Sequence, residues 1–309
     1  MNMNPEINFV KNIDIDYLKW DQCIDNSPFG IVYAYTWFLD RICPHWDALI
    51  WGDYLYIMPL ANGSKFGIRY IYQPFFTQQL GIFSAFPPEP EIVNQFLNSI
   101  PGQFKLTEMK LNLGNRPTTN QFRINSNTTY HLHLNAGSEI LRDNYSTNTH
   151  RNIQKAAKNK IFISQVYDIH LFMKFTQTNL KEKSPEIKPV HYFALQKVIS
   201  HALVMQLGEI YGAWDASNNL VAAAFFLTTH QQSIYLAASS NAQGIEQSAM
   251  FLLIDTFIQN NTEKKLILDF EGSNMAGIAR FYAGFGAEPK VYFSVYQNRL
   301  PKLLQILKR

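Results

Sequence analysis

The sequence predicts an α/β protein built from two units that share one order of elements. Alternating apolar runs typical of strands and amphipathic runs typical of helices follow one another along the chain. Clusters of Gly, Pro and Asn divide these runs into short elements. The length of 309 residues corresponds to two domains of about 150 residues, and related motifs recur at a spacing of about 160.

In the first half, the patterns predict two helices, a strand meander, a third helix and two further strands. Trp37, Phe38 and Ile42 have helical spacing, and Pro101-Gly102 ends the third helix. The pair Asn62-Gly63 is typical of a hairpin turn and is predicted to join two strands. The predicted helices cover residues 13–25, 35–42 and 91–100, and the strands cover 47–51, 54–60, 68–73, 104–113 and 128–135.

The second half has the same plan. Ser146-Thr-Asn-Thr offers several side chains that can cap a helix, and Asn218-Asn219 is typical of a turn. The predicted helices cover residues 150–159, 168–181, 190–204, 249–260 and 276–283, and the strands cover 161–166, 209–214, 220–229, 233–238, 265–270 and 290–296.

Residues at matching places indicate that the second half repeats the first. Trp51 and Trp214 each end an apolar strand, and they are 163 residues apart. Gly81 and Gly244, which each precede a helix, are also 163 residues apart. Leu-Asn-Leu-Gly at 111–114 has a counterpart in Asp-Phe-Glu-Gly at 269–272. A tandem duplication of one α/β unit leaves such a pattern, with domains at 1–138 and 139–309. The alternative is two unrelated α/β domains that share these residues by chance.

Composition excludes several classes of protein. Apolar residues make up 47% and charged residues 17%, unlike disordered, collagen-like or coiled-coil chains. The first 135 residues have nine basic and eleven acidic side chains, and the others have eighteen and thirteen. The positive charge therefore belongs to the second half, but no basic tail indicates binding to DNA.

The cysteines, the apolar runs and the histidines favour a cytoplasmic protein without a metal site. Cys23 and Cys43 lack disulfide or zinc-site spacing. The N-terminus lacks a signal-peptide pattern, and the longest apolar run, at 220–227, is far shorter than the ~18 residues that span a bilayer. His131-x-His133 has no nearby carboxylate pair in the sequence. We therefore expect no metal and no membrane span.

The most specific motif lies near the end of the second half. Asp269 and Glu271 are two residues apart on a predicted strand, so their side chains share a face. Gly272 permits a tight turn, and Ser273 or Asn274 can cap the following helix. Carboxylates at the carboxyl end of a strand lie where open α/β sheets bind ligands. The alternative is that both carboxylates stabilise the positive end of the next helix.

This stretch, with Tyr282 and Gly286 in residues 278–287, resembles the end of an acetyltransferase-type (GNAT) fold. The Asp-Phe-Glu-Gly-Ser version, the upstream Tyr145-Ser and Ile153-Gln-Lys-Ala, and Gln78-Gln-Leu-Gly-Ile are closer to the FemABX-like branch. The resemblance implies two tandem acetyltransferase-like domains, each a mixed central sheet flanked by helices, with the site in the C-terminal one. Members of this branch are N-acyltransferases that add amino acids from aminoacyl-tRNA to peptidoglycan precursors.

The resemblance also implies roles for residues near the motif. Glu271 or Asp269 would act as the base or orient the attacking amine, and Tyr282 would protonate the leaving group. The donor, acyl-coenzyme A or aminoacyl-tRNA, would bind at the turn before the helix at 249–260. Its expected ligands are Gly244, Gln247, Ser248, Ala249, Asn274 and, for its phosphates, Arg151 and Lys155.

Both donor-binding elements have a second interpretation. The turn has a single Gly, and Glu246 would place a negative charge near a phosphate, so it is either a donor site or an inherited turn without a ligand. Arg151, Lys155 and Lys158 share one helical face. That face is either a clamp for donor phosphates or a tRNA backbone, or a solvated amphipathic surface.

Aromatic and amide side chains gather in the first half without charges. Tyr35, Trp37, Gln73 and Gln78 could line an acceptor pocket, although an aromatic core explains the same residues. We expect transfer of an acyl or aminoacyl group from an activated donor to the amine of a small molecule or peptide. The alternative is a catalytically inert binding or scaffold protein with the same fold. No long charged hairpin of the kind that contacts tRNA in the peptidoglycan enzymes is visible, so donors other than aminoacyl-tRNA have to be considered.

Overall fold

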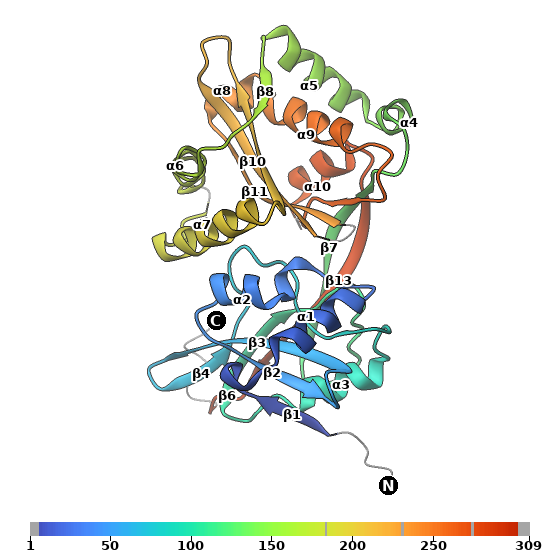
Figure 1. Ribbon diagram of the computed structural model, residues 1–309, viewed down its shortest axis with the longest axis vertical. Coiled ribbons are helices and arrows are strands. Elements are labelled where there is room, and N and C mark those ends of the chain that lie inside the picture. Colours follow the sequence, from blue (N-terminus) through green and yellow to red (C-terminus); the bar gives the residue numbers. More distant parts are fainter. Residues whose placement is uncertain (1–5, 183, 230–231, 273–274, 302–309) are drawn as a thin grey trace. The chain divides into compact units, whose positions relative to one another are not determined.

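The computed structural model (Figure 1) describes residues 6–182, 184–229, 232–272 and 275–301. The chain forms two compact units. The N-terminal unit contains residues up to Asn127 and those from Val291 onward, and the C-terminal unit contains Thr128–Lys290. Both units combine one sheet with helices on its two faces (Figure 1).

The sheet of the N-terminal unit has the strand order β1-β2-β3-β4-β6-β13, with β5 paired to β3. β4 and β6 run parallel, and the other neighbours are antiparallel. The elements of this unit are β1 (Ile7–Val10), the 3-10 turn η1 (Asn12–Asp14), α1 (Tyr17–Asn26), the 3-10 turn η2 (Val32–Ala34), α2 (Thr36–Ile42), β2 (Trp46–Trp51), β3 (Tyr56–Lys65), β4 (Ile68–Ile71), β5 (Phe83–Ser84), α3 (Pro90–Asn98), β6 (Phe104–Lys110) and most of β13 (Glu288–Asn298).

The sheet of the C-terminal unit has the strand order β8-β9-β10-β11-β12-β7, in which β11 and β12 are the parallel pair. The elements of this unit are the second half of β7 (Arg123–His133), α4 (Ser138–Asp143), α5 (Thr147–Lys158), β8 (Phe162–Gln165), α6 (Ile169–Leu180), α7 (Pro189–Val204), β9 (Gly208–Trp214), β10 (Leu220–Thr229), β11 (Gln232–Ser240), α8 (Ala242–Glu246), α9 (Ala249–Asn260), β12 (Ile267–Asp269) and α10 (Ala276–Ala283).

Each sheet is completed by a strand from the other half of the sequence. β7 follows β6 along the chain, but its residues 131–133 pair with β12 in the C-terminal unit. β13 follows β12, but its residues 294–298 pair with β6 in the N-terminal unit. Apart from this exchange, both units contain an edge strand, two helices, a three-stranded meander, a helix and a strand parallel to the last strand of the meander. The C-terminal unit has the additional helices α4, α5, α8 and α10, and the N-terminal unit has the additional strand β5.

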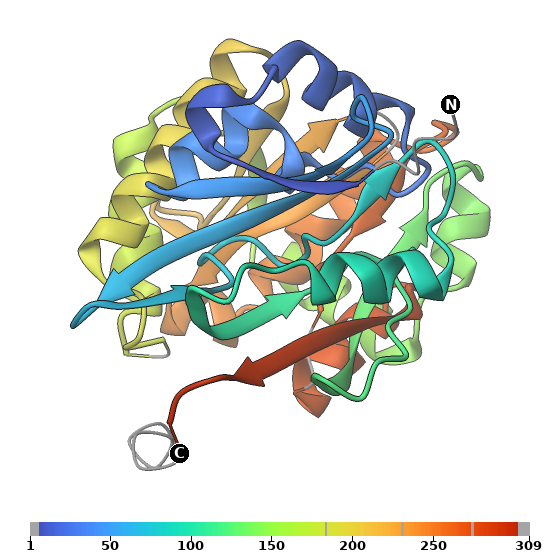
Figure 2. The same cartoon turned by 90° about the horizontal axis from the view of Figure 1, so that it is seen from below.

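The N-terminal unit has helices on both faces of its sheet. Figure 2 shows α1 and α2 on one side of the strands and α3 on the other. The apolar face of α3 is buried because Val93, Phe96 and Leu97 recur at helical spacing. They pack against side chains of β2 and β3 that include Leu49 and Met58. The alternation along β2 sends neighbouring residues to the opposite face.

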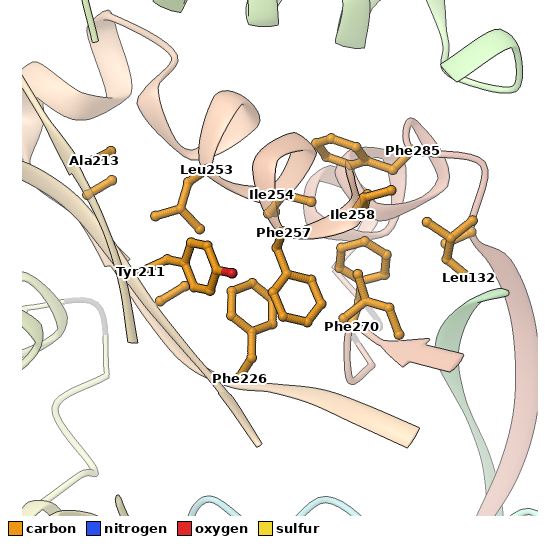
Figure 3. Close-up of a cluster of buried hydrophobic side chains, with 14 of the residues drawn as sticks. Leu132, Tyr211, Ala213, Phe226, Leu253, Ile254, Phe257, Ile258, Phe270 and Phe285 are labelled. Atoms are coloured by element: carbon orange, nitrogen blue, oxygen red, sulfur yellow. The ribbon is translucent and has the colours of Figure 1, made fainter. Parts of the chain in front are cut away.

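The core of the C-terminal unit is centred on α9. Leu253, Ile254, Phe257 and Ile258 of this helix are buried against the sheet (Figure 3). Phe257 stacks on Phe226 of β10, with ring centroids 3.7 Å apart and planes 4° from parallel. α5 lies beside α9 on this face, and α6 and α7 cover the other (Figure 1).

Many of the predicted elements are confirmed, and the helices at 249–260 and 276–283 have the predicted bounds. The prediction of a turn at Asn62-Gly63 was wrong, because both residues lie inside β3. The Asn62 side chain is buried and donates to Asp47 and to a backbone carbonyl, which holds it in the sheet. The turn lies instead at Phe66 and Gly67, with φ of 52° and 76°.

Candidate functional site

The candidate site of the C-terminal unit lies where two parallel strands part. The pairing of β11 with β12 ends at Ile234 and Asp269. β12 stops there, whereas β11 continues to Ser240. The chain directly after β12 remains hydrogen-bonded to β7, because the Phe270 N–H donates to the Tyr130 carbonyl. The carboxyl ends of parallel strands are where sheets of this kind bind ligands.

Asp269, the last residue of β12, is 1% exposed and holds this turn together. Its Oδ1 accepts hydrogen bonds from the Thr129 hydroxyl at 2.7 Å and from the Glu271 N–H at 2.8 Å. Its Oδ2 accepts one from Gln232 at 3.0 Å and lies 3.2 Å from Nε2 of His131. Both oxygens are thus engaged by the protein. This geometry suits orienting Glu271 better than accepting a proton from a substrate.

Glu271 has a left-handed backbone conformation, with φ of 58°. This conformation is uncommon for residues other than Gly, and strained residues of this kind cluster at functional sites. The hydrogen bond from its N–H to Asp269 helps to hold it. Burial raises the pKa of the Glu271 carboxyl to about 8, because the charged form loses its hydration. Such a carboxyl is a stronger base than an exposed one and titrates close to neutral pH.

Tyr282, on α10, lies near the same carboxylates. Its ring stacks on Phe270 with centroids 4.9 Å apart, and it also meets Tyr130 and Tyr235 at 6.1 and 6.3 Å. Burial raises the pKa of the Tyr282 hydroxyl, and the charges of the two carboxylates raise it further. The hydroxyl therefore stays protonated at neutral pH and can donate a proton. The three predicted catalytic residues thus come from one small region of the C-terminal unit.

The predicted donor loop contains the short helix α8. The Asn241 side chain caps this helix by accepting a hydrogen bond from the Gly244 N–H at 2.7 Å. Gly244 is buried against the Val221 carbonyl of β10 and leaves no room for a Cβ atom. The absence of a side chain at Gly244 therefore serves close packing on the sheet, and its N–H is engaged by the protein.

The start of α9 offers other groups to a ligand. Ser248, which precedes the helix, has φ of 60° and donates its hydroxyl to Asn152 of α5 at 2.8 Å. The Phe251 N–H donates to the Ser248 carbonyl, which leaves the N–H groups of Ala249 and Met250 without a partner among the described residues. N–H groups at the start of a helix attract anions, but Ala249 is buried here. The Oε1 atom of Gln247 is buried and has no hydrogen-bond partner among the described residues. Buried acceptors are normally hydrogen-bonded, so a bound ligand could supply the missing donor to this oxygen.

α5 brings basic side chains to this position. It packs along α9 (Figure 1), and the Asn152–Ser248 hydrogen bond ties it to the start of that helix. Arg151 and Lys155 flank Asn152 on α5, and Lys158 follows one turn later; all three are exposed. Exposed cations near a helix N-terminus attract phosphate groups, although Ser248 and Ala249 at this N-terminus are themselves buried.

The predicted acceptor residues all lie in the N-terminal unit. Each makes contacts inside that unit: Tyr35 with Asp25, Trp37 with Phe38, Gln73 with Thr77 and Lys110, and Gln78 with Gln79. Gln73 links the chain after β4 to β6, because it donates to one segment and accepts from the other. These contacts serve packing, and the acceptor role of the four residues stays a prediction.

The matching position in the N-terminal unit is filled by the chain itself. After β4, Leu80 forms a parallel bridge with Leu111, which follows β6. Beyond it, Asn115 accepts from the Ile82 N–H at 2.7 Å, and Asn112 donates to the Ile82 carbonyl at 2.8 Å. No comparable bridge follows the last β11–β12 pair among the described residues of the C-terminal unit. This difference favours the C-terminal unit as the one that carries the site.

The residues that support the carboxylates were not found from the sequence. Thr129, His131 and Gln232 lie on β7 and β11, and sequence spacing gives no signal that these strands flank β12. Asn152, which links α5 to the donor loop, also lacks such a signal. Asn274, a predicted donor ligand, lies outside the described residues.

Within the part of the chain that the structure describes, no three His, Cys, Asp or Glu side chains are grouped to hold a metal ion. In the same part, no helix has both the length and the apolar character needed to cross a membrane.

The repeated topology and the parting parallel strands define a tandem acetyltransferase-like (GNAT) fold, and solved structures confirm it. FemX superposes with a TM-score of 0.66 at 11% identity, over 96% of this chain and 99% of FemX. A conserved protein of unknown function from Bacteroides thetaiotaomicron has a TM-score of 0.60 at 8% identity, over 95% and 100% of the two chains. A tandem GNAT protein from the clavulanic acid biosynthesis pathway has a TM-score of 0.56 at 11% identity, over 96% and 100%.

These identities show a common fold. No protein-family model matches the sequence, and no curated protein matches it. The resemblance to tandem acetyltransferases of the FemABX-like kind is thereby confirmed at the level of the fold.

Proposed function

We propose that this protein is an N-acyltransferase that moves an acyl or aminoacyl group from an activated donor to an amine. The observation that carries the proposal is the Glu271 carboxyl, which has a pKa of about 8 and lies at the point where β11 and β12 part. Its strained backbone and its proximity to Tyr282 support a catalytic role. The tandem GNAT fold shared with FemX and the clavulanic acid protein supports the class of reaction.

The proposed reaction uses two proton transfers. The amine nitrogen forms a bond to the acyl carbonyl carbon, and the bond from that carbon to the leaving sulfur or oxygen breaks. Glu271 accepts the proton that the amine loses, and Tyr282 donates a proton to the leaving atom. Asp269 keeps Glu271 in position through its backbone N–H.

The proposed donor is an acyl-coenzyme A or an aminoacyl-tRNA, because both carry phosphates. Arg151, Lys155 and the N–H groups of Ala249 and Met250 at the start of α9 would bind these phosphates. Gln247 would use its orphaned oxygen to accept a hydrogen bond from the donor. The clavulanic acid protein is described as a structure without AcCoA, which makes coenzyme A thioesters the first donors to test. The proposed acceptor is the amine of a small molecule or peptide.

One observation favours a second candidate, a catalytically inert binding protein. α8 fills the donor loop, and the Gly244 N–H is already bound to Asn241. A loop that uses its own groups in this way has fewer N–H donors for a pyrophosphate.

Transfer assays with mass-spectrometric detection test the proposal. The protein is incubated with acetyl-coenzyme A or aminoacyl-tRNA and a panel of primary amines between pH 6 and 9. We expect kcat/KM to rise with pH and to level off above about pH 8, since the base must be ionised. Glu271→Gln should lower kcat about 100-fold or more, and Tyr282→Phe should lower it at least tenfold.

The matched control is Glu263→Gln, which removes an exposed carboxylate from another residue with left-handed φ in the same unit. It should leave kcat unchanged. Donor binding is followed separately by the shift in unfolding temperature. Binding without transfer to any amine would favour the inert candidate. A shift with neither donor, together with no transfer, would refute the enzyme proposal.

A further inference from the structure

A cavity of about 610 Å³ opens on the N-terminal unit, in a region that the acyl-transfer proposal does not use. Its wall comes from residues near η1, the end of α2, the start of β2 and the β3–β4 hairpin. The volume suits a small ligand. The wall contains four charged side chains, Lys11, Asp40, Asp47 and Arg69, in addition to His45.

Two of the four charges neutralise each other. Lys11 and Asp47 form an ion pair with 3.2 Å between Nζ and Oδ2, and Asn62 also donates to this carboxylate. Asp40 and Arg69 form no ion pair with any residue of the described part of the chain. One lone negative and one lone positive group therefore line the same cavity.

The Asp40 carboxylate is fixed by two aromatic side chains. The Trp46 indole N–H donates to its Oδ1 at 2.8 Å, and the Tyr17 hydroxyl donates to the same atom at 3.2 Å. The two rings stack at 6.1 Å with 26° between their planes. Within the described part of the chain, no group donates to Oδ2. A carboxylate oxygen beside two aromatic rings is a favourable environment for an ammonium group.

The Arg69 guanidinium is held in place at two points. Its Nη1 donates to Gln103 at 2.9 Å, and its Cζ lies 5.3 Å from the centroid of the Phe104 ring. The remaining N–H groups have no acceptor among the described residues. A guanidinium fixed in this way can bind a carboxylate through two parallel hydrogen bonds at a small entropic cost.

We propose that this cavity binds a zwitterion, with its ammonium group at Asp40 and its carboxylate at Arg69. A simple cation or anion would leave one of the two charged side chains unpaired, whereas a zwitterion pairs both. Free amino acids and the two ends of a short peptide share this chemistry. The binding site is separate in sequence from Glu271 and Tyr282, so the proposal does not depend on the acyl-transfer function.

Nuclear magnetic resonance of the full-length protein tests this proposal, with the Trp46 indole N–H as the reporter inside the cavity. The probes are glycine, 6-aminohexanoate and triglycine, with propylamine and propionate as ligands that carry one charge only. We expect saturable shifts of the Trp46 signal with at least one zwitterion, and binding at least tenfold tighter than for either single-charge ligand. The zwitterion that binds best identifies the source as a free amino acid, an extended amino acid or a peptide.

Two variants and two controls assign the contacts. Asp40→Asn and Arg69→Gln should each weaken the zwitterion at least tenfold. Asn retains an oxygen for Trp46 and Tyr17, and unfolding temperatures show whether each variant is folded. The controls Asp14→Asn and Arg123→Gln change exposed residues of the same unit outside the cavity and should have no effect. The proposal is overturned if no zwitterion shifts Trp46, if single-charge ligands bind equally well, or if both folded variants bind like the unchanged protein.

Discussion

Replacing Glu271 with Gln should stabilise the folded protein above about pH 5 while it strongly lowers the proposed transfer activity. The pKa of this carboxyl is raised from 4.5 to about 8 by burial. Between these two pH values, the unfolded chain releases a proton that the folded protein retains, so the free energy of unfolding falls as pH rises. At 1.36 kcal/mol for each pKa unit, the loss reaches about 3 kcal/mol at pH 7 and about 5 kcal/mol above pH 8. Glu271 is partly exposed, so solvent screening makes these values upper limits.

Urea unfolding at pH 5, 7 and 9 measures this effect. Gln has the shape of the protonated carboxyl but no charge to bury, so Glu271→Gln should match the unchanged protein near pH 5. It should become progressively more stable than the unchanged protein as pH rises to 9. The control Glu263→Gln alters an exposed carboxylate at another left-handed residue and should show no such trend. The transition of the C-terminal unit is the one to compare, since the chain has two compact units.

The opposite sign would refute the reasoning. If Glu271 acts instead as a negative charge that stabilises the start of α10, Glu271→Gln lowers stability at pH 7 and leaves transfer unchanged. Equal stability of the two proteins at pH 9 would also contradict a carboxyl whose pKa is raised by burial. The stability measurement is therefore independent of any knowledge of the substrates.

Three other changes and one control substitution test the packing of the C-terminal unit by chemical denaturation. Phe257→Ala removes one ring of the 3.7 Å stack in the core and should cost about 3–5 kcal/mol; a loss below 1 kcal/mol would mean that the stack is not formed. Gly244→Ala places a methyl group against the Val221 carbonyl and should cost about 1–3 kcal/mol. In contrast, Gly277→Ala on α10, where no described atom lies within 4 Å of the added methyl group, should be neutral or stabilising. Asp255→Ala leaves the buried Tyr145 hydroxyl without its hydrogen-bond acceptor and should cost about 2 kcal/mol. An unchanged unfolding midpoint would contradict this.

Hydrophobic periodicity was sufficient to predict the elements whose sequence signal is local. The helix at 249–260 is apolar at helical spacing, and the structure has the same bounds. The turn at Asn218-Asn219 was also predicted correctly, because Asn218 adopts φ of 61° and Asp215 caps the turn through local hydrogen bonds. In contrast, the turn signal of Asn62-Gly63 was overridden by burial of the Asn62 side chain against Asp47. A tertiary contact of this kind has no signature in the local sequence.

The same limit applies to the candidate site. The spacing of Asp269 and Glu271 predicted two carboxylates on one face of a strand, and this prediction was only partly correct. Asp269 ends β12, but Glu271 lies beyond the strand in a turn with φ of 58°, so the two residues do not share a strand face. Their different environments could not be predicted, because Asp269 is surrounded by groups from β7 and β11. The left-handed conformation of Glu271 could not be predicted either. This conformation favours Gly, and nothing in the sequence indicates that a Glu adopts it at this position.

The strand exchange sets the order in which the protein can fold during synthesis. β13 leaves the ribosome after every other strand, yet its residues 294–298 pair with β6 in the N-terminal unit. Until then, β6 presents an unpaired edge of the kind that promotes aggregation. The N-terminal unit therefore cannot complete its sheet before almost the whole chain has been made, although its other strands are synthesised first. A fragment that ends after β7 would contain a strand that belongs to the absent sheet and would lack the strand that its own sheet requires.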